Sequence, residues 1–299
     1  MKISGWGQYP KIEAKITAPQ DLDKLLLSIK NGNAIARGNG RAYGDSAISA
    51  QNTIKMEHFK NIISFDQETG ELIAEAGILL YDIIKTFLPL GWFPFVTPGT
   101  KYVTLGGMIA ADIHGKNHYK DGSFRKCVDW IDLITGNGEE LRCSKFKNTE
   151  LFEWTMGGMG LTGVILRASI RLKPINSAYI KRQILLADDL YQVIKIFEKS
   201  KDITYRVAWI DCLSKGNKFG RSLVMLGEHA ETSEIPYQYR KTPLKTPKRL
   251  KFRIPFNFPS WVLNRYSLKI YNKIYYWQEK YQSRQEFVDV EKFFYPLDK

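Results

Sequence analysis

Two glycine-rich segments carry the residue types in this chain that are best suited to ligand chemistry. The first runs from Ala36 to Ala47 and reads ARGNGRAYGDSA, and the second runs from Thr97 to His118 and reads TPGTKYVTLGGMIAADIHGKNH. Glycine lets the backbone adopt positive φ, so consecutive N–H groups can converge on an anion. Because two such segments follow one another about fifty residues apart, we expect them to hold one extended ligand with a diphosphate in its middle.

The elements that must position these segments alternate between strand and helix. Apolar periodicity predicts helices over 22–29 and 79–88, and β-rich runs predict strands over 34–36, 72–76, 130–135 and 140–143. Asn137-Gly138 predicts a type I′ hairpin turn between the last two strands. The first half of the chain is therefore mixed α and β.

A third glycine-rich run, from Gly158 to Gly163, satisfies the Gly-x-Gly-x-x-Gly pattern of dinucleotide-binding Rossmann folds. That pattern requires a strand before it and a helix after it. Here residues 150–156 predict a short helix and residues 164–172 alternate as a half-buried strand, so the order is reversed. The sequence therefore argues against a nicotinamide site of the Rossmann type.

After about Pro174 the pattern changes to strand, helix, strand and strand, over 179–186, 190–197, 205–212 and 222–227. A β-α-β-β series with antiparallel character is typical of half a ferredoxin-like sandwich. We therefore predict an α+β protein with two domains: residues 1–175, made of two α+β subdomains, and residues 176–299, an incomplete ferredoxin-like domain.

The charge of the chain is concentrated in one segment. The 299 residues hold 44 Lys or Arg against 31 Asp or Glu, and residues 240–284 hold twelve of these cations against a single acid, Glu279, together with ten aromatic residues. Basic residues interleaved with aromatics suit an anionic membrane surface or a nucleic acid, and a solvated basic face over buried aromatics is the structural alternative. For the segment as a whole we predict peripheral membrane contact and no nucleic acid, with Lys245, Lys248, Arg249 and Lys251 among the contacting cations.

Several classes of protein are disfavoured. No apolar run approaches the roughly 18 residues that span a bilayer, and the N-terminus lacks a signal-peptide pattern. Three scattered cysteines make neither a disulfide framework nor a metal site. Asp112, His114, His118 and Asp121 are close in sequence, but Gly115 and Asn117 between them disfavour a ligating helix. We predict no metal and a cytoplasmic protein, peripheral at the inner face of the membrane.

Taken in order, the glycine segments resemble the FAD-linked oxidases of the vanillyl-alcohol-oxidase type, which have a PCMH-type FAD-binding domain. The resemblance rests on segments 37–45, 98–100, 106–107, 112–117 and 157–163. The string DIHGKNH at 112–118 is most similar to the decaprenylphosphoryl-β-D-ribose 2-oxidase branch, and the likeness runs from Gly5 to Asp298. It implies a PCMH-type FAD-binding fold followed by part of a substrate (cap) domain.

The resemblance also implies site residues. The positions that match FAD contacts are Arg37, Gly38, Asn39, Gly40, Arg41, Ala42, Tyr43, Ser46, Ala47, Pro98, Gly99, Thr100, Thr104, Gly106, Gly107, Ala110, Ile113, His114, Asn117 and Ile165. Many oxidases of this type hold FAD covalently through a histidine at the position of Arg41. Arginine cannot form that bond, so we expect non-covalent FAD, with Arg41 adding charge near the diphosphate.

For the substrate, the resemblance implies oxidation of a sugar hydroxyl, the 2′-OH of a polyprenyl-phosphoryl pentose. His114 and Lys116 match substrate-pocket positions, and their chemistry suits a sugar hydroxyl and an anionic headgroup respectively. The family's catalytic lysine lies in a stretch beyond the position of Asp298, so no residue here is assigned as catalytic.

Other functions stay open at this point. One alternative is an aldonolactone or sugar-alcohol oxidase of the same superfamily, acting on a free rather than a lipid-linked sugar. Another is a non-catalytic FAD-binding fragment, or one subunit of a split enzyme whose C-terminal half is encoded separately.

Overall fold

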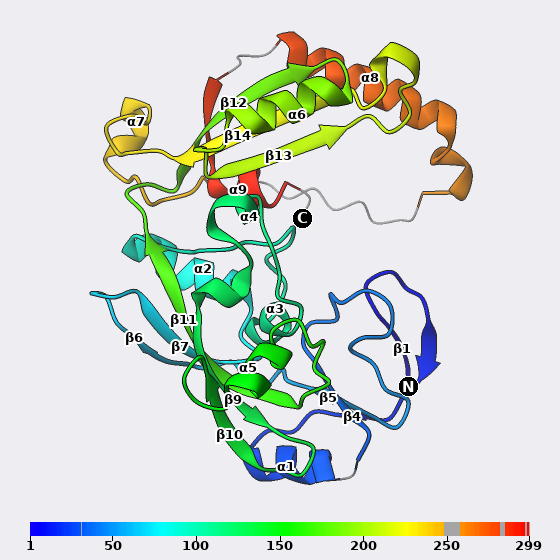
Figure 1. Cartoon of the computed structure of the whole chain (residues 1–299), viewed down its shortest axis with the longest axis vertical. Coiled ribbons are helices and arrows are strands. Elements are labelled where there is room, and N and C mark those ends of the chain that lie inside the picture. The colour runs from blue at the N-terminus through cyan, green and yellow to red at the C-terminus, as the bar shows by residue number, and fades with distance from the viewer. Residues whose placement is uncertain (31, 248–257, 282–284, 297, 299) are drawn as a thin grey trace. The chain divides into compact units, whose positions relative to one another are not determined.

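The computed structural model describes residues 1–30, 32–247, 258–281, 285–296 and 298 (Figure 1). The chain forms two compact units, one made of Met1–Gly115 and Gly122–Pro174 and the other of Lys116–Asp121 and Ile175–Lys299. Both units combine helices with sheets that are mostly antiparallel, so the predicted α+β class is confirmed. Lys248, Arg249 and Lys251 lie outside the described residues.

A small parallel sheet begins the first unit. Its strand order is β3 (Ile16–Thr17), β5 (Asn52–Lys55) and β4 (Ala34–Arg37), and the hairpin of β1 (Lys2–Ser4) and β2 (Lys11–Glu13) lies outside it. Helix α1 (Leu22–Lys30) buries Leu25 and Ile29 in the same cluster as Ile54 of β5. Since β4 ends at Arg37, the sheet delivers the first glycine segment from a fixed strand end.

The larger sheet of the first unit supplies the second and third glycine segments. Its order is β10 (Glu140–Ser144), β9 (Val128–Ile134), β11 (Val164–Pro174), β7 (Glu71–Glu75) and β6 (Ile62–Phe65), with β8 (Trp92–Pro94) also pairing with β11. The helices α2 (Leu80–Phe87), α3 (Leu105–Ala110) and α5 (Thr149–Thr155) connect these strands (Figure 1). The predicted helices and strands of this region are present, with small shifts at their ends.

The hairpin between β9 and β10 differs from the prediction in its turn. Gly138 has φ +82°, but Asn137 is not at positive φ, so the predicted type I′ turn is wrong. The N–H of Gly138 donates to Thr135 O (2.9 Å), and the N–H of Thr135 donates to Glu139 O (3.0 Å). The loop therefore has three residues, with glycine at its left-handed position, which is a common alternative for joining two strands.

A sheet of order β13 (Tyr205–Ile210), β14 (Ser222–His229), β12 (Tyr179–Ala187) and β15 (Gln285–Asp289), antiparallel throughout, forms the second unit. Helix α6 (Leu190–Lys199) follows β12, and α8 (Arg265–Tyr281) precedes β15. The predicted β-α-β-β series is present, and α8 and β15, which the sequence pattern did not predict, continue it.

The two long helices of this unit cover opposite faces of its sheet (Figure 1). Leu185, Val224 and Ala208 lie in the cluster under α6. On the alternate face, Trp209 of β13 contacts Tyr275 of α8 with ring centroids 5.0 Å apart. Successive strand residues point to opposite faces, so the strand order follows the ferredoxin-like pattern while the helix placement does not.

Residues 116–121 belong to the second unit although they interrupt the first in sequence. The N–H of Arg206 donates to Lys116 O (2.8 Å), and its guanidinium lies 4.2 Å from the ring centroid of Tyr119 in the short helix α4 (His118–Asp121). The ammonium of Lys120 donates to Asp202 O (3.0 Å). Nothing in the sequence pattern predicted this excursion of the chain.

Candidate functional site

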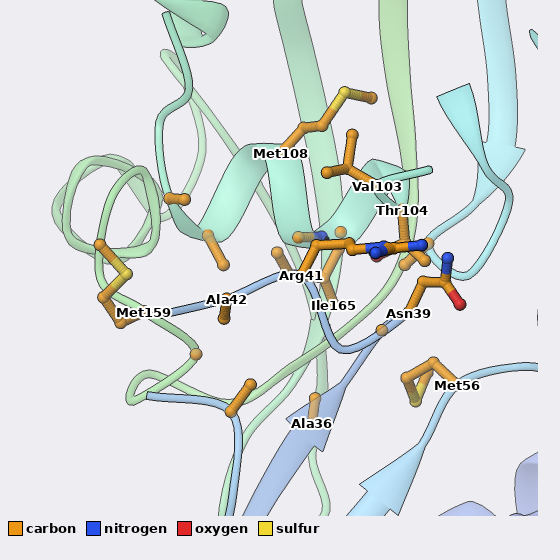
Figure 2. A pocket seen from close by; sticks show the side chains of 18 of the residues that line it. Ala36, Asn39, Arg41, Ala42, Met56, Val103, Thr104, Met108, Met159 and Ile165 are labelled. Carbon is orange, nitrogen blue, oxygen red and sulfur yellow. Dashed lines mark hydrogen bonds between the residues drawn. The ribbon is translucent and has the colours of Figure 1, made fainter. Parts of the chain in front are cut away.

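All three glycine segments line one pocket within the first unit. Figure 2 shows the first segment passing below α3. Arg41 of this segment lies near Val103 and Thr104, and Met159 lies at the opposite end of the pocket. The pocket has an empty volume of about 940 Å³, its open mouth included. The residues that line it come from several segments between Ala36 and Ile165. An extended ligand with both polar and apolar parts fits such a pocket.

Glycine at position 38 lets the first two segments meet. A Cβ at Gly38 would lie 2.2 Å from Thr104 Oγ1. Thr104 is the N-cap of α3, where its hydroxyl accepts a hydrogen bond from Gly107 N (3.2 Å). The side-chain amide of Asn39 donates to Tyr102 O (2.8 Å), which adds a second tie between the segments. The glycines therefore serve close approach as well as backbone freedom.

Arg41 is the cation of the pocket wall. Its guanidinium carbon lies 4.5 Å from the ring centroid of Trp6 and 5.8 Å from that of Tyr102. Its Nε is buried, and within the described part of the chain it has no hydrogen-bond partner. Burying a polar group without a partner is costly, so an anionic oxygen at this atom would satisfy it.

Arg37 has a different role from Arg41. Its guanidinium donates to Ser4 O (2.8 Å) and Ala47 O (3.3 Å), and burial lowers its pKa. The bond to Ala47 joins the two ends of the first glycine segment, and the bond to Ser4 ties the segment to β1. Arg37 thus fixes the shape of the segment, while Arg41 keeps a donor for a ligand.

The structure brings most of the predicted FAD contacts together. The predicted residues that line the pocket are Gly38, Asn39, Gly40, Arg41, Ala42, Ser46, Ala47, Thr104, Gly106, Gly107, Ala110, Ile113 and Ile165. Those outside its lining are Arg37, Tyr43, Pro98, Gly99, Thr100, His114 and Asn117, of which Tyr43, Gly99 and His114 are exposed and Asn117 belongs to the second unit.

Sequence reasoning missed a largely apolar part of the lining. The additional residues are Ala36, Met56, Ala76, Val103, Met108, Ala111, Met159, Gly160 and Gly163. The resemblance already implied that the third glycine run, which holds the last three, passes close under the adenosine half of the cofactor, whereas Met56 and Met108 carry no local signal that separates them from ordinary core residues. Apolar side chains of this kind suit the flat faces of aromatic rings, so the lining as a whole fits a dinucleotide that contains flavin.

Asp112 holds the third glycine run beside α3. Its carboxylate, at a residue with φ +38°, accepts hydrogen bonds from Arg125 N (3.0 Å), Arg125 Nε (2.7 Å) and the Ser123 hydroxyl (3.0 Å). Burial alone would raise its pKa, but these bonds outweigh burial and lower it. The second guanidinium arm of Arg125 donates to Met156 O (2.8 Å), directly before the glycine run. In the described parts of the chain, no three His, Cys, Asp or Glu side chains converge to hold a metal ion.

The two predicted substrate residues lie on opposite sides of a unit boundary. His114 is exposed in the first unit. Lys116 is in the second unit, where its ammonium donates to Phe294 O (3.4 Å) and lies 5.7 Å from the ring centroids of both Phe293 and Phe294. Burial in this aromatic surrounding lowers the pKa of Lys116.

Comparison with known proteins identifies the cofactor of this chain. The family model described as an FAD binding domain matches residues 15–144, which include the first two glycine segments. The chain has a PCMH-type FAD-binding domain. The cofactor is FAD, and the resemblance predicted from the glycine segments is confirmed.

Three relatives show the breadth of the family. Decaprenylphosphoryl-beta-D-ribose oxidase of Mycolicibacterium smegmatis is 33% identical over 99% of this chain and 66% of its own length. Cytokinin dehydrogenase 2 of Arabidopsis thaliana is 31% identical over 51% of this chain and 31% of its own length. L-gulonolactone oxidase of Bos taurus is 27% identical over 58% of this chain and 41% of its own length. The chain thus spans just under two thirds of the first relative and less than half of the other two.

Proposed function

We propose that this chain takes part in FAD-dependent oxidation of a sugar hydroxyl, the 2′-OH of a polyprenyl-phosphoryl pentose. The observation that carries the proposal is the pocket shared by three glycine segments, with the unpaired Nε of Arg41 in its wall. The choice of substrate rests on similarity to decaprenylphosphoryl-beta-D-ribose oxidase, which matches 99% of the chain. In this proposal the first unit is the FAD-binding domain and the second is part of the substrate domain.

Residues of this chain would hold FAD in defined ways. The backbone of residues 38–42 and the guanidinium of Arg41 would bind the diphosphate, and Met56, Met108 and Met159 would pack on the rings and exclude water. The chemistry that FAD supplies is acceptance of a hydride from an alcohol carbon. We propose that the cofactor is held without a covalent bond, because arginine stands where a histidine would form one.

Two further residues would act on the substrate. Lys116 would attract the phosphate of a lipid-linked sugar, since its ammonium carries three N–H donors in aromatic surroundings and one of them reaches Phe294 O (3.4 Å). His114 would hydrogen-bond a sugar hydroxyl from its exposed position. The proton of the reacting hydroxyl needs a base, and no residue of this chain is proposed for it.

Absorbance of the purified chain tests the proposal. FAD added to the protein should give bound flavin bands near about 370 and 450 nm. Anaerobic addition of a polyprenyl-phosphoryl pentose should bleach the bands. Lys116→Gln should weaken this response and leave FAD binding unchanged, whereas Lys126→Gln, which changes an exposed lysine ten residues along the chain, should change neither.

Other outcomes decide against parts of the proposal. Bleaching by an aldonolactone but not by the lipid-linked sugar would favour the second candidate, which the gulonolactone oxidase relative supports. Bands that appear and do not bleach with either compound would identify an FAD-binding chain that needs another polypeptide, such as a separately encoded C-terminal half. Absence of bound flavin would refute the assignment of the pocket.

A further inference from the structure

Helix α8 presents one fixed face to the sheet of the second unit. Its first turn is capped by Asn264, whose Oδ1 accepts hydrogen bonds from Tyr266 N (2.8 Å) and Ser267 N (3.1 Å). On the inward side, the Asn272 amide donates to Asp211 (2.7 Å) and the Tyr276 hydroxyl donates to Asp188 (3.0 Å). These contacts determine which side chains of α8 point away from the sheet.

The outward face of α8 is a stripe of aromatic and aliphatic side chains. Tyr266, Ile270, Ile274 and Trp277 are 77%, 61%, 50% and 60% exposed. Their spacing of four, four and three residues places them on one side of the helix. Trp261 and Leu263, directly before the helix, are also exposed. Exposed apolar groups gathered in this way mark an interaction surface rather than a solvated face.

Cations flank this stripe along one edge. Arg265, Lys269 and Lys273 are all exposed and follow one another at four-residue spacing. Glu279, the acid of segment 240–284, is half-buried, and at helical spacing it lies on the inward side with Asn272 and Tyr276. The outward surface of α8 in its described part is therefore apolar along its middle and positive at its edge.

We propose that this outward face docks on an anionic lipid bilayer, with α8 lying in the plane of the headgroups. A helix with an apolar face, aromatic residues and flanking Lys or Arg binds at the membrane interface, and anionic lipids strengthen the binding. Single-stranded nucleic acid fits less well, because Ile270 and Ile274 offer its bases no stacking surface. No helix in the described part is long and apolar enough to cross a bilayer. This inference goes beyond the proposed function, since it would hold for any substrate.

Co-sedimentation with vesicles tests the inference. The wild-type chain should bind vesicles of equal parts phosphatidylcholine and phosphatidylglycerol and should not bind phosphatidylcholine alone. Each cation near the surface contributes roughly fivefold to the affinity, so Lys269→Glu with Lys273→Glu should weaken binding by about 25-fold or more. Ile270→Ser with Trp277→Ser should weaken it through loss of apolar burial.

Helix α6 of the same unit offers matched controls. Tyr191 and Ile194 are exposed on it to a similar extent, 66% and 48%, and Lys195 and Lys199 are exposed as well. Tyr191→Ser with Ile194→Ser, and Lys195→Glu with Lys199→Glu, should bind the anionic vesicles as the wild type does.

A conservative variant guards against misfolding of the others. Trp277→Phe should still bind anionic vesicles but should show a smaller blue shift of tryptophan fluorescence on binding. The inference is overturned if the wild type does not distinguish the two vesicle compositions, or if the α6 and α8 variants lose binding equally. It is also overturned if the α8 variants keep vesicle binding, or lose only binding to single-stranded nucleic acid or to a second copy of the chain.

Discussion

Replacing Gly38 by alanine should damage the pocket through a single contact. The added Cβ would lie 2.2 Å from Thr104 Oγ1, whereas real Cβ atoms essentially never approach another heavy atom closer than 3.0 Å. Either Thr104 or the first glycine segment must therefore move by at least about 0.8 Å. Rotation of Thr104 would break the N-cap of α3, and movement of the segment would displace the backbone groups around Arg41.

Both movements should lower the stability of the first unit, and movement of the segment should also weaken FAD binding. Overpacking of this kind costs about 1–3 kcal/mol, and loss of an N-cap costs about 1 kcal/mol. A loss of about 2 kcal/mol in a unit of this size should lower its melting temperature by about 4–8 °C. If the segment moves and one charge-assisted hydrogen bond to the diphosphate is lost, the Kd for FAD should rise about 10- to 150-fold.

Thermal melting and FAD titration measure both effects. Gly136→Ala is the matched control, because a Cβ at Gly136 would meet nothing within 4 Å, and it should behave as the wild type. Gly38→Ala combined with Thr104→Ala should be less damaged than the sum of the single variants, since the nearest remaining Thr104 atom is Cβ at 3.2 Å. Strictly additive losses, or a Gly38→Ala variant that matches Gly136→Ala, would refute the contact between the two segments.

Three further predictions concern FAD binding and stability. Arg41→Met should raise the Kd for FAD by about 10- to 150-fold through the loss of a charge-assisted hydrogen bond. Acid precipitation of the wild-type protein should leave the flavin in solution, and a yellow pellet would contradict non-covalent binding. Burial would raise the pKa of Asp132, but hydrogen bonds from Arg142 and Arg167 outweigh burial and lower this pKa. The contribution of Asp132 to folding stability is therefore complete above the pKa of the unfolded state, about 4, and is lost as the pH falls below that value. Asp132→Asn should lower the free energy of unfolding at pH 7, measured by urea titration, by about 2 kcal/mol and should flatten the decline of this free energy below pH 4. Asp129→Asn is the control, because it removes a more exposed ion pair with Arg171 and should cost at most about 1 kcal/mol. Equal losses for the two variants would be inconsistent with this account.

Local pattern was enough to predict the elements that carry the site. The strand through Val164–Pro174 alternates from Leu166 onward because one face of the strand is buried while Arg171 and Lys173 lie on the more exposed face. Helix α2 is amphipathic because its apolar side packs on the same sheet, where Phe87 contacts Phe65 of β6. The glycine segments were recognisable because close backbone approach leaves glycine little alternative, as at Gly38. These features depend on residues that are close together in the sequence, so the local pattern predicts them.

Features that depend on distant contacts were not predicted. Met56 and Met108 become pocket residues only when three segments come together. Helix α8 was missed as a helix because its most regular apolar spacing, at Tyr266, Ile270 and Ile274, marks an exposed stripe instead of a core face. Strand β15 is short, half polar and defined by its pairing with β12, so its identity comes from its partner.

The excursion of residues 116–121 has a consequence for dissecting this protein. The backbone passes between the two units three times, after Gly115, after Asp121 and after Pro174. A cut at Pro174 would leave Tyr119 and Lys120 on the severed piece without the Arg206 and Asp202 groups that hold them, and would open the second unit where they were seated. A separable FAD-binding domain would instead have to join Gly115 directly to Gly122, two glycines that already bracket the excursion.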